Sequence, residues 1–586
     1  MRKLIIYSFL LLLFLLFTVT SNLSPVLAIV DPLAVPNNRF GIHIIQATPD
    51  ESSPAASLVN TNGDWGYVTV LIESKDRNHN KWQEFFNDLR RRHLIPIVRL
   101  ATEPEGNFWK RPYEGEELAW ADFLDTLNWP TKNRYIIIYN EPNHAKEWGN
   151  KVDASDYAKT LDKTITALKN KHSLISSQGS EIKNSDFFVL NGGFDASAPS
   201  KMPEYEDQVN FMQKMDEAVP GIFEKLDGWV SHSYPNPGFI GSPDGIGRGT
   251  VRTYFWEIQQ LRNLGVNKNL PIFITETGWK HAEGLNYNRN LPDAETVAKY
   301  FQQAFENVWN TTRIVAVTPF LLSYQESPFD HFSFKKIGAE KQYYPMYTAI
   351  SDLQKITGKP IQQNMAQLIS GEIYSSIVSG ENYTVSLTFK NTGQSIWNDP
   401  LDPSKQVKLV ATEGSRELGI TTAELPKDTA IQPGQEFTFK LGLKAPQSGT
   451  FKVVLNLLNG EKQFDSESLK FTTTVKSPVI LKIKGALLWK DDFSGNYILS
   501  IKGATGENSQ NVTLDKGGVS SEIEAKYLLP DYKFDFILEK PFYKPTRLQK
   551  TVYTGVNILD FGKLEPDMLS AIFNPAKLWK LLPFSK

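Results

Sequence analysis

The sequence of 586 residues contains no cysteine. This absence excludes disulfide bonds, cysteine-ligated metals and thiol catalysis. A formal net charge of −2 gives no reason to expect nucleic acid as a partner. The 8 histidines form no His-Glu-x-x-His motif, and neither a Gly-x-Ser-x-Gly elbow nor a phosphate loop occurs. We therefore expect no metal, no cofactor, and neither a zinc hydrolase, a serine hydrolase nor a kinase.

Long apolar runs are missing except at the N-terminus. There, Arg2 and Lys3 precede the apolar run Leu4–Phe17, and the small-residue end Val26-Leu27-Ala28 follows. This layout is typical of a secretory signal peptide. An uncleaved membrane anchor is the alternative, but the run is shorter than the roughly 20 apolar residues that a spanning helix needs. We predict that residues 1–28 are a signal peptide and that the protein is secreted or extracytoplasmic, with surface association as a further option.

Short β-branched runs alternate with amphipathic helical stretches from about Arg39 to Leu353. The predicted strands are Phe40–Ile45, Tyr67–Ile72, Ile95–Leu100, Tyr135–Tyr139, Phe187–Asn191, Gly228–His232, Ile272–Thr275 and Val315–Leu321. The helices between them include Lys81–His93, Ala154–Lys169, Val251–Leu264 and Ala294–Trp309. Because the strands are apolar on both faces, they are typical of a parallel sheet covered by helices. The fold class that we predict is α/β, with a (β/α)₈ TIM barrel over residues 29–358.

A doubly wound open sheet is the structural alternative to the barrel. That fold usually has fewer strands and a glycine-rich first turn. The first turn here, Ile45-Gln46-Ala47-Thr48, contains no glycine. The barrel is therefore the favoured interpretation.

The pattern changes after about Lys359 to short alternating segments separated by turns. The predicted strands there are Tyr383–Phe389, Gln406–Ala411, Glu436–Leu443, Thr450–Leu457, Tyr497–Ile501 and Lys533–Leu538. We predict two small all-β sandwich-like domains, over residues 359–476 and 477–565, and an amphipathic tail over residues 566–586. The tail is either an interfacial helix on a membrane or wall or, as we favour, a helix docked on its own sandwich.

Two predicted strands end in a glutamate. The fourth leads into Asn140-Glu141-Pro142-Asn143, and Pro142 stops the strand because it cannot donate to a ladder. The seventh leads into Glu276-Thr277-Gly278-Trp279. Barrels carry their chemistry on the rim at the carboxyl ends of the strands. Strands four and seven face each other across the carboxyl end of the barrel. The carboxyl groups of Glu141 and Glu276 are therefore expected to point toward the same space.

Two facing carboxylates suit glycoside hydrolysis. One protonates the leaving oxygen, and the other attacks the anomeric carbon or activates water. The sixth strand adds His232 and Tyr234, which lie on the same face at a spacing of two. A phenol beside Glu276 would keep that carboxylate ionised and oriented. For His232, a purely structural role is the alternative.

These three strand ends resemble the retaining glycoside hydrolases of the large (β/α)₈ clan called clan A. The resemblance implies that Glu141 is the acid/base, that Glu276 is the nucleophile, and that Asn140 bonds the sugar 2-hydroxyl. The clan's His-x-Tyr on strand six matches His232 and Tyr234. Members of the clan often carry an arginine on an early strand, near the nucleophile. Arg99, which we count on strand three, is the candidate for this arginine. Tyr324 or Phe320 matches the clan's aromatic residue after strand eight.

Other side chains near predicted strand ends are candidates for substrate binding. They are His43 on the first strand, Trp148 after the acid/base loop, and Trp279 with His281 after the nucleophile. An indole beside the two glutamates would form a platform for a sugar ring, although packing within a loop is the alternative for each. Further carboxylates near strand ends leave other pairings open: Glu283, Glu326 and Asp330.

The first β-rich domain is similar to the immunoglobulin-like accessory domains of exported enzymes. The similarity rests on Phe389-Lys390-Asn391-Thr392-Gly393, Trp397 and Pro433-Gly434-Gln435. The sequence thus predicts an exported, monomeric, retaining glycosidase that acts on an oligo- or polysaccharide. A non-catalytic carbohydrate-binding or adhesion protein on the same barrel is one alternative. A transglycosylase that uses the same two glutamates is another.

Overall fold

The computed structural model describes residues 29–171, 174–175, 181–182, 186–503 and 506–568. The chain divides into two compact units between Gln363 and Asn364. The predicted signal peptide lies outside the described residues, as does the predicted tail beyond residue 568. Among the described helices, none combines the length and the apolar character that a membrane span requires.

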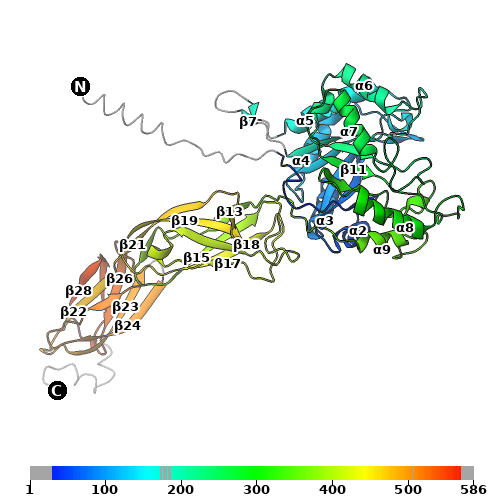
Figure 1. Ribbon diagram of the computed structural model, residues 1–586. Helices are drawn as coiled ribbons and strands as arrows, with labels where there is room; N and C mark the ends of the chain where they lie inside the picture. The colour runs from blue at the N-terminus through cyan, green and yellow to red at the C-terminus, as the bar shows by residue number, and fades with distance from the viewer. Residues whose placement is uncertain (1–28, 172–173, 176–180, 183–185, 504–505, 569–586) are drawn as a thin grey trace, which may run out of the picture. The chain divides into compact units, whose positions relative to one another are not determined.

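The first unit is built on parallel strands (Figure 1). Eight of them lie in the described residues: β1 (Gly41–Ile44), β2 (Gly66–Glu73), β3 (Leu94–Ala101), β6 (Arg134–Ile138), β9 (Phe187–Asn191), β10 (Trp229–His232), β11 (Ile272–Glu276) and β12 (Ile314–Val317). They pair in the orders β1-β2-β3-β6-β9 and β10-β11-β12. Isolated parallel bridges join Leu190 to Gly228 and Phe40 to Val317, at both junctions between the two sheets.

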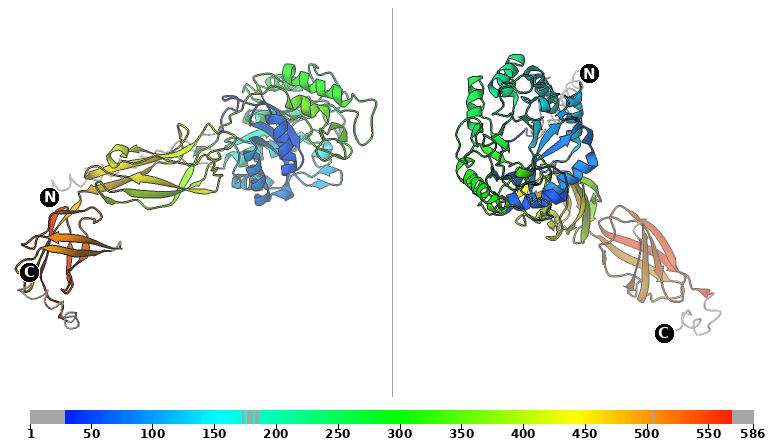
Figure 2. Two further views of the ribbon diagram at one scale, coloured as in Figure 1. Left: turned by 90° about the horizontal axis from the view of Figure 1, so that it is seen from below. Right: turned by 90° about the vertical axis from the view of Figure 1, so that its right-hand side faces the viewer.

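Helices follow most of these strands and surround them on the outside (Figure 2). They are α2 (Pro49–Asn60), α3 (His79–Arg91), α4 (Glu116–Thr126), α5 (Ala154–Lys169), α6 (Gln208–Ala218), α7 (Thr253–Asn263), α8 (Ala294–Gln303) and α9 (Pro345–Ser351). In α3, Trp82, Phe86 and Leu89 are buried at helical spacing, and the Asn78 side chain caps the first turn. An amphipathic helix of this kind is stable because its apolar face packs on the strands.

Short elements occupy the connections of this unit. They are η1 (Ser74–Asp76), β4 (Pro104–Glu105), β5 (Phe108–Trp109), η2 (Ala145–Glu147), β7 (Leu174–Ile175), β8 (Glu181–Ile182), η3 (Ile222–Lys225), η4 (Ala304–Val308) and η5 (Asp330–Phe332). The hairpin β4–β5 and the single turn η2 both follow strands that carry candidate site residues.

The strands of the first unit are buried on both faces. Tyr67, Ile97, Tyr135 and Phe273 belong to a cluster enclosed among the strands. A larger cluster, which includes Trp120 and many other residues, lies between the strands and the helices. This two-sided burial explains why the strands are continuous apolar runs in the sequence.

Two elements of the first unit differ from their predicted bounds by more than two residues. The eighth strand ends at Val317 rather than Leu321, because Pro319 has no N–H to continue a ladder. The predicted helix Ala294–Trp309 ends as an α-helix at Gln303 and continues as the π-helical turn η4. The helix α5 has the predicted bounds, Ala154–Lys169.

The second unit is rich in antiparallel strands. Between residues 364 and 476 it contains β13 (Ala366–Gly371), β14 (Ser376–Val378), β15 (Tyr383–Asn391), β16 (Val407–Glu413), the turn α10 (Ser415–Leu418), β17 (Ala423–Glu424), β18 (Glu436–Leu443), β19 (Gly449–Asn459), β20 (Lys462–Gln463) and β21 (Leu469–Lys476). These strands form two sheets around one core, in which Trp397 is fully buried.

A second set of strands follows from Val479. It comprises β22 (Val479–Leu487), β23 (Gly495–Gly503), β24 (Gly506–Leu514), β25 (Ile523–Ala525), β26 (Lys533–Glu539), β27 (Thr546–Thr551) and β28 (Gly555–Leu564). They form the sheets β25-β22-β28 and β24-β23-β26-β27 around a core of their own. The alternating burial of β15 and β26 has the period of two that the sequence indicated.

Candidate active site

A cavity of about 560 Å³ opens in the first unit where the parallel strands end. Seven of the residues predicted for the site line it: His43, Arg99, Asn140, Glu141, His232, Tyr234 and Glu276. They come from β1, β3 and the strand ends of β6, β10 and β11. Because these strands are parallel, their carboxyl ends meet at one rim and bring together residues that are far apart in the sequence.

Glu276, the last residue of β11, is held on both carboxylate oxygens. Arg99 Nη1 donates to Oε1 at 2.7 Å, and the Tyr234 hydroxyl donates to Oε2 at 3.1 Å. Burial opposes ionisation of this carboxyl, but the charges of His232 and Arg99 outweigh burial and lower its pKa. Glu276 is therefore kept as an oriented carboxylate, which is the form that a nucleophile requires.

Glu141 lies three residues beyond the end of β6, on a sharp turn. Tyr139 and Glu141 have φ values of 64° and 27°. Such values are uncommon for residues other than glycine and occur where a turn is held by its surroundings. The turn places Glu141 Oε1 2.7 Å from His232 Nδ1 and Glu141 Oε2 3.8 Å from His144 Nδ1.

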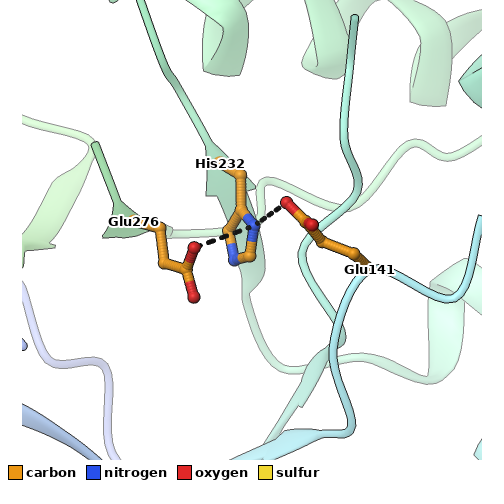
Figure 3. A group of neighbouring side chains, drawn as sticks. All are labelled: Glu141, His232 and Glu276. Carbon is orange, nitrogen blue, oxygen red and sulfur yellow. Dashed lines mark hydrogen bonds and ion pairs between the residues drawn. The ribbon is translucent and has the colours of Figure 1, made fainter. Parts of the chain in front are cut away.

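His232 lies between the two glutamates (Figure 3). Its Nδ1 is 2.7 Å from Glu141 Oε1 and 3.7 Å from Glu276 Oε2. One carboxylate oxygen of each glutamate and a ring nitrogen of His232 all lie within 4.8 Å of one another. Burial lowers the pKa of His232, but the charges of Glu276 and Glu141 raise it by more than burial lowers it. The net shift of the His232 pKa is therefore upward. The predicted pair of glutamates thus shares one centre.

Arg99 connects the nucleophile candidate to Asn140. It lies on β3, the third parallel strand, and its Nη1 donates both to Glu276 Oε1 and to Asn140 Oδ1, the latter at 2.8 Å. Because a guanidinium stays charged, this contact fixes the position of both side chains.

His43 is buried and faces the cavity from β1. Both of its ring nitrogens are without a hydrogen-bond partner among the described residues. Burial, followed by the charge of Arg99, lowers its pKa to about 3. A neutral imidazole keeps one donor and one acceptor. His43 is therefore equipped to bond a ligand that enters the cavity.

The two tryptophans predicted as sugar platforms do not line the cavity. Trp148 and Trp279 are each 1% exposed. Trp148 Nε1 donates to Asp156 Oδ2 at 3.0 Å, and Trp279 Nε1 donates to the Gly241 carbonyl at 2.7 Å. These indoles pack inside the loops and satisfy their N–H groups there, so the prediction of a binding role is corrected for both.

His281 and the alternative carboxylates are also placed elsewhere. His281 is buried against the Ser333 carbonyl, 3.0 Å from its Nε2. Glu283 and Asp330 accept backbone N–H groups from Ala294 and Leu285, at 3.0 and 2.8 Å. Neither they nor Glu326, which is exposed, are among the cavity residues, so none of them forms an alternative pair with Glu141 or Glu276.

The cavity contains functional candidates that the sequence reasoning missed. The polar ones are Glu73, His144, Glu147, Asp195, Ser197, Asn236 and Lys280, and the aromatic ones are Trp109, Phe239, Phe329 and Phe332. Both candidates after strand eight, Phe320 and Tyr324, line it as well. His144 and Glu147 share the loop of Glu141, so their closeness in sequence was a usable signal. Asp195 gave no such signal, since only the fold brings its Oδ2 to 2.8 Å from His144 Nε2.

Glu141, His232 and Glu276 are the one group in the described part of the chain with the spacing to hold a metal ion. Arg99 already places a positive charge 2.7 Å from Glu276. A second cation would be repelled at that distance. The donor set therefore fits acid/base and nucleophilic chemistry better than metal binding.

No protein-family model and no curated protein matches the sequence. The neighbours among solved structures include glycoside hydrolases, and the three described here have TM-scores below 0.4. A family 39 glycoside hydrolase from Bacteroides cellulosilyticus WH2 is 14% identical, with a TM-score of 0.38 over 71% of this chain and 82% of its own. A triple mutant of the endo-beta-1,4-glucanase of Xanthomonas axonopodis pv. citri is 14% identical, with a TM-score of 0.34 over 53% and 98%. A calcium-binding mutant of Bacteroides uniformis beta-glucuronidase 2 is 9% identical, with a TM-score of 0.35 over 84% and 64%.

Proposed function

We propose that this protein is a retaining glycoside hydrolase whose parallel strands close into a (β/α)₈ barrel. The observation that carries the proposal is the pair Glu141 and Glu276 at one centre, with carboxylate oxygens within 4.8 Å of each other. Retaining enzymes hold their two carboxyl groups about 5–5.5 Å apart, whereas inverting enzymes leave room for a water molecule between them. The close spacing supports direct attack by one carboxylate.

The reaction takes two steps. Glu276 attacks the anomeric carbon, the bond to the leaving oxygen breaks, and the proton of Glu141 passes to that oxygen. Water then attacks the glycosyl-enzyme while Glu141 takes a proton from it, which returns both side chains to their starting forms. Glu276 is assigned as the nucleophile and Glu141 as the acid/base because Arg99 and Tyr234 hold Glu276 as a carboxylate.

The remaining cavity residues have roles in binding. His43 has unpaired ring nitrogens that fit a sugar hydroxyl, since a hydroxyl both donates and accepts. Arg99 Nη1 donates to the amide oxygen of Asn140. The NH₂ group of Asn140 is therefore left to bond a substrate oxygen, as the clan resemblance implies. The aromatic residues Phe320, Tyr324 and Phe329 offer apolar surface to a sugar ring.

We further propose that the enzyme is exported, acts on an oligo- or polysaccharide and works as a monomer. Export rests on the N-terminal sequence pattern. The β-rich second unit is proposed as a spacer or adhesion module near a cell surface or wall, because all the cavity residues belong to the first unit.

The test is a pair of substitutions assayed on a panel of 4-nitrophenyl glycosides and on the matching unactivated disaccharides. We expect Glu276→Ala to abolish turnover of both kinds of substrate. Glu141→Ala should lower turnover of disaccharides roughly 10²–10⁴-fold and spare the nitrophenyl glycosides, whose leaving group needs no proton. Glu326→Ala, on an exposed carboxylate outside the cavity, is the matched control.

Equal losses on both kinds of substrate would contradict the assigned roles. The first anomer seen by proton NMR should keep the configuration of the substrate, and an inverted anomer would disprove retention. Binding of glycans without any turnover would favour the carbohydrate-binding alternative. Products carrying an added acceptor sugar would identify a transglycosylase.

A further inference from the structure

His144 is a second histidine beside the acid/base candidate, and the two-step reaction does not use it. It follows Glu141 by three residues in the loop after β6, and it lines the cavity. Its Nδ1 is 3.8 Å from Glu141 Oε2, while Glu141 Oε1 is 2.7 Å from His232 Nδ1. A distance of 3.8 Å is too long for a hydrogen bond but short enough for an interaction between charges. The Glu141 carboxyl therefore lies between two imidazole rings, one facing each of its oxygens.

The ring of His144 is held on its other side by Asp195. His144 Nε2 is 2.8 Å from Asp195 Oδ2, and the ring packs edge-on against Tyr205 with the centroids 4.8 Å apart. Because a carboxylate only accepts hydrogen bonds, this contact assigns a proton to Nε2. In the neutral ring, Nδ1 then carries a lone pair toward Glu141, and in the charged ring it carries a proton.

Asp195 is itself fixed by neighbouring groups. Asn143 Oδ1 accepts from the backbone N–H of Asp195 at 3.2 Å, and Asn143 Nδ2 donates to the Asp195 carbonyl at 2.9 Å. The backbone N–H of Ser197 donates to Asp195 Oδ1 at 2.8 Å. Asn143 is fully buried and belongs to the same loop as Glu141. These contacts join the loop after β6 to the loop after β9, and they hold the Asp195 carboxylate against His144.

We propose that His144 and Asp195 are positioning residues that hold the Glu141 carboxyl in the orientation from which it donates its proton to the leaving oxygen. The inference rests on the proposed hydrolase function. A general acid acts only when its carboxyl is within hydrogen-bond reach of the oxygen that it protonates. Fixing that carboxyl before substrate binds avoids the cost of ordering it during the reaction.

The charges around His144 provide a second readout, which does not depend on turnover. Burial lowers the pKa of His144, but the bond to Asp195 and the charge of Glu141 raise it by more, so the net shift is upward. The titratable groups that face the ring are Glu141 and Glu147 on its own loop, and Asp195 and Tyr205 between β9 and α6. The titration of His144 therefore reports whether Asp195 and Glu141 are in contact with it.

The first experiment measures kcat/KM on disaccharides and on 4-nitrophenyl glycosides for His144→Phe and Asp195→Ala, each alone and combined with Glu141→Ala, in the full chain. Phenylalanine keeps an aromatic ring against Tyr205 but has no nitrogen. We expect each single variant to lower kcat/KM on disaccharides about 10-fold and to spare the nitrophenyl glycosides, whose leaving group needs no proton. Neither should have a further effect when Glu141 is already alanine. His79→Phe, which changes an exposed histidine outside the cavity, is the control.

Full activity of His144→Phe on disaccharides would overturn the proposal, because the ring would then serve only packing. Equal losses on both kinds of substrate would also overturn it, since they would show general damage to the cavity. Losses that multiply with that of Glu141→Ala would show that His144 and Asp195 act without Glu141, which contradicts the proposal.

The second experiment follows the titration of His144 by NMR in protein labelled with ¹³C at histidine, and the His144 signal is identified by its loss in His144→Phe. We expect it to titrate above the ordinary value of 6.5 and to move to lower pH in both Asp195→Ala and Glu141→Gln. If the wild type hydrolyses none of the glycosides, the proposed function fails, and the contact is decided by this titration alone. A lower pKa in Glu141→Gln would then support the contact, and an unchanged one would refute it.

Discussion

At the scale of single residues, the burial of His43 is expected to make the free energy of unfolding depend on pH. Its pKa lies at about 3 in the folded protein, against an ordinary value of 6.5. The unfolded chain therefore binds more protons at this position below about pH 6.5, and the free energy of unfolding falls as the pH is lowered from about 6.5 toward 3.

We predict that His43→Gln makes Tm less sensitive to pH within this window. Glutamine keeps a donor and an acceptor toward the cavity but does not titrate. The measurement is Tm against pH for both proteins. The carboxyl of Glu51, whose pKa is raised to about 7, has the opposite sign and remains in both. Parallel curves for the two proteins would show that His43 titrates normally in the folded state.

At the scale of elements, the segment after β9 approaches β10 so closely that only glycine fits at position 193. A Cβ on Gly193 would lie 2.2 Å from His232 Cδ2 and 2.3 Å from Nε2. The side chain of His232 is itself only 2% exposed, so it has little room to move away. The approach of these two elements therefore fixes the ring that contacts Glu141.

Gly193→Ala is expected to displace His232 and to lower kcat/KM about 100-fold, since a shift of about 1 Å in a catalytic arrangement has this effect. The measurement is kinetics on the same nitrophenyl glycosides, with a Tm determination alongside. Gly442→Ala is the matched control, because a Cβ there would meet neighbours at ordinary contact distance, 3.4 and 3.5 Å. Full activity in Gly193→Ala would show that the His232 ring is not held by this contact.

At the scale of the whole molecule, the division between Gln363 and Asn364 separates the candidate chemistry from the β-rich unit. The cavity residues all belong to the first unit, which has its own cores among and around the strands. A unit with its own core is expected to fold independently.

We predict that a fragment of residues 29–363 folds and keeps kcat/KM on nitrophenyl glycosides within about twofold of the full chain. Calorimetry of the full chain should show more than one transition, one of which matches that of the fragment. A fragment that is folded but inactive would show that the second unit contributes to the site.

The sequence by itself determined the alternation of elements and the strand ends that carry Asn140, Glu141 and Glu276. These features are local: apolar runs, helical spacing and a proline that ends a strand are visible within a few residues. The bounds of α5 and β9 were predicted for the same reason. The exposure of a large side chain depends on the loops packed around it and is not a local property. For this reason the prediction that Trp148 and Trp279 bind a sugar was wrong.

Only the tertiary structure decided which side chains face the cavity. Arg99 reaches Glu276 across 177 positions of sequence, and Asp195 reaches His144 across 51. Such contacts depend on the pairing order of strands and on the path of loops, which no periodicity encodes. The candidate catalytic glutamates could thus be read from the strand ends in the sequence. The charged residues that set the ionisation of these glutamates are brought together only by the fold.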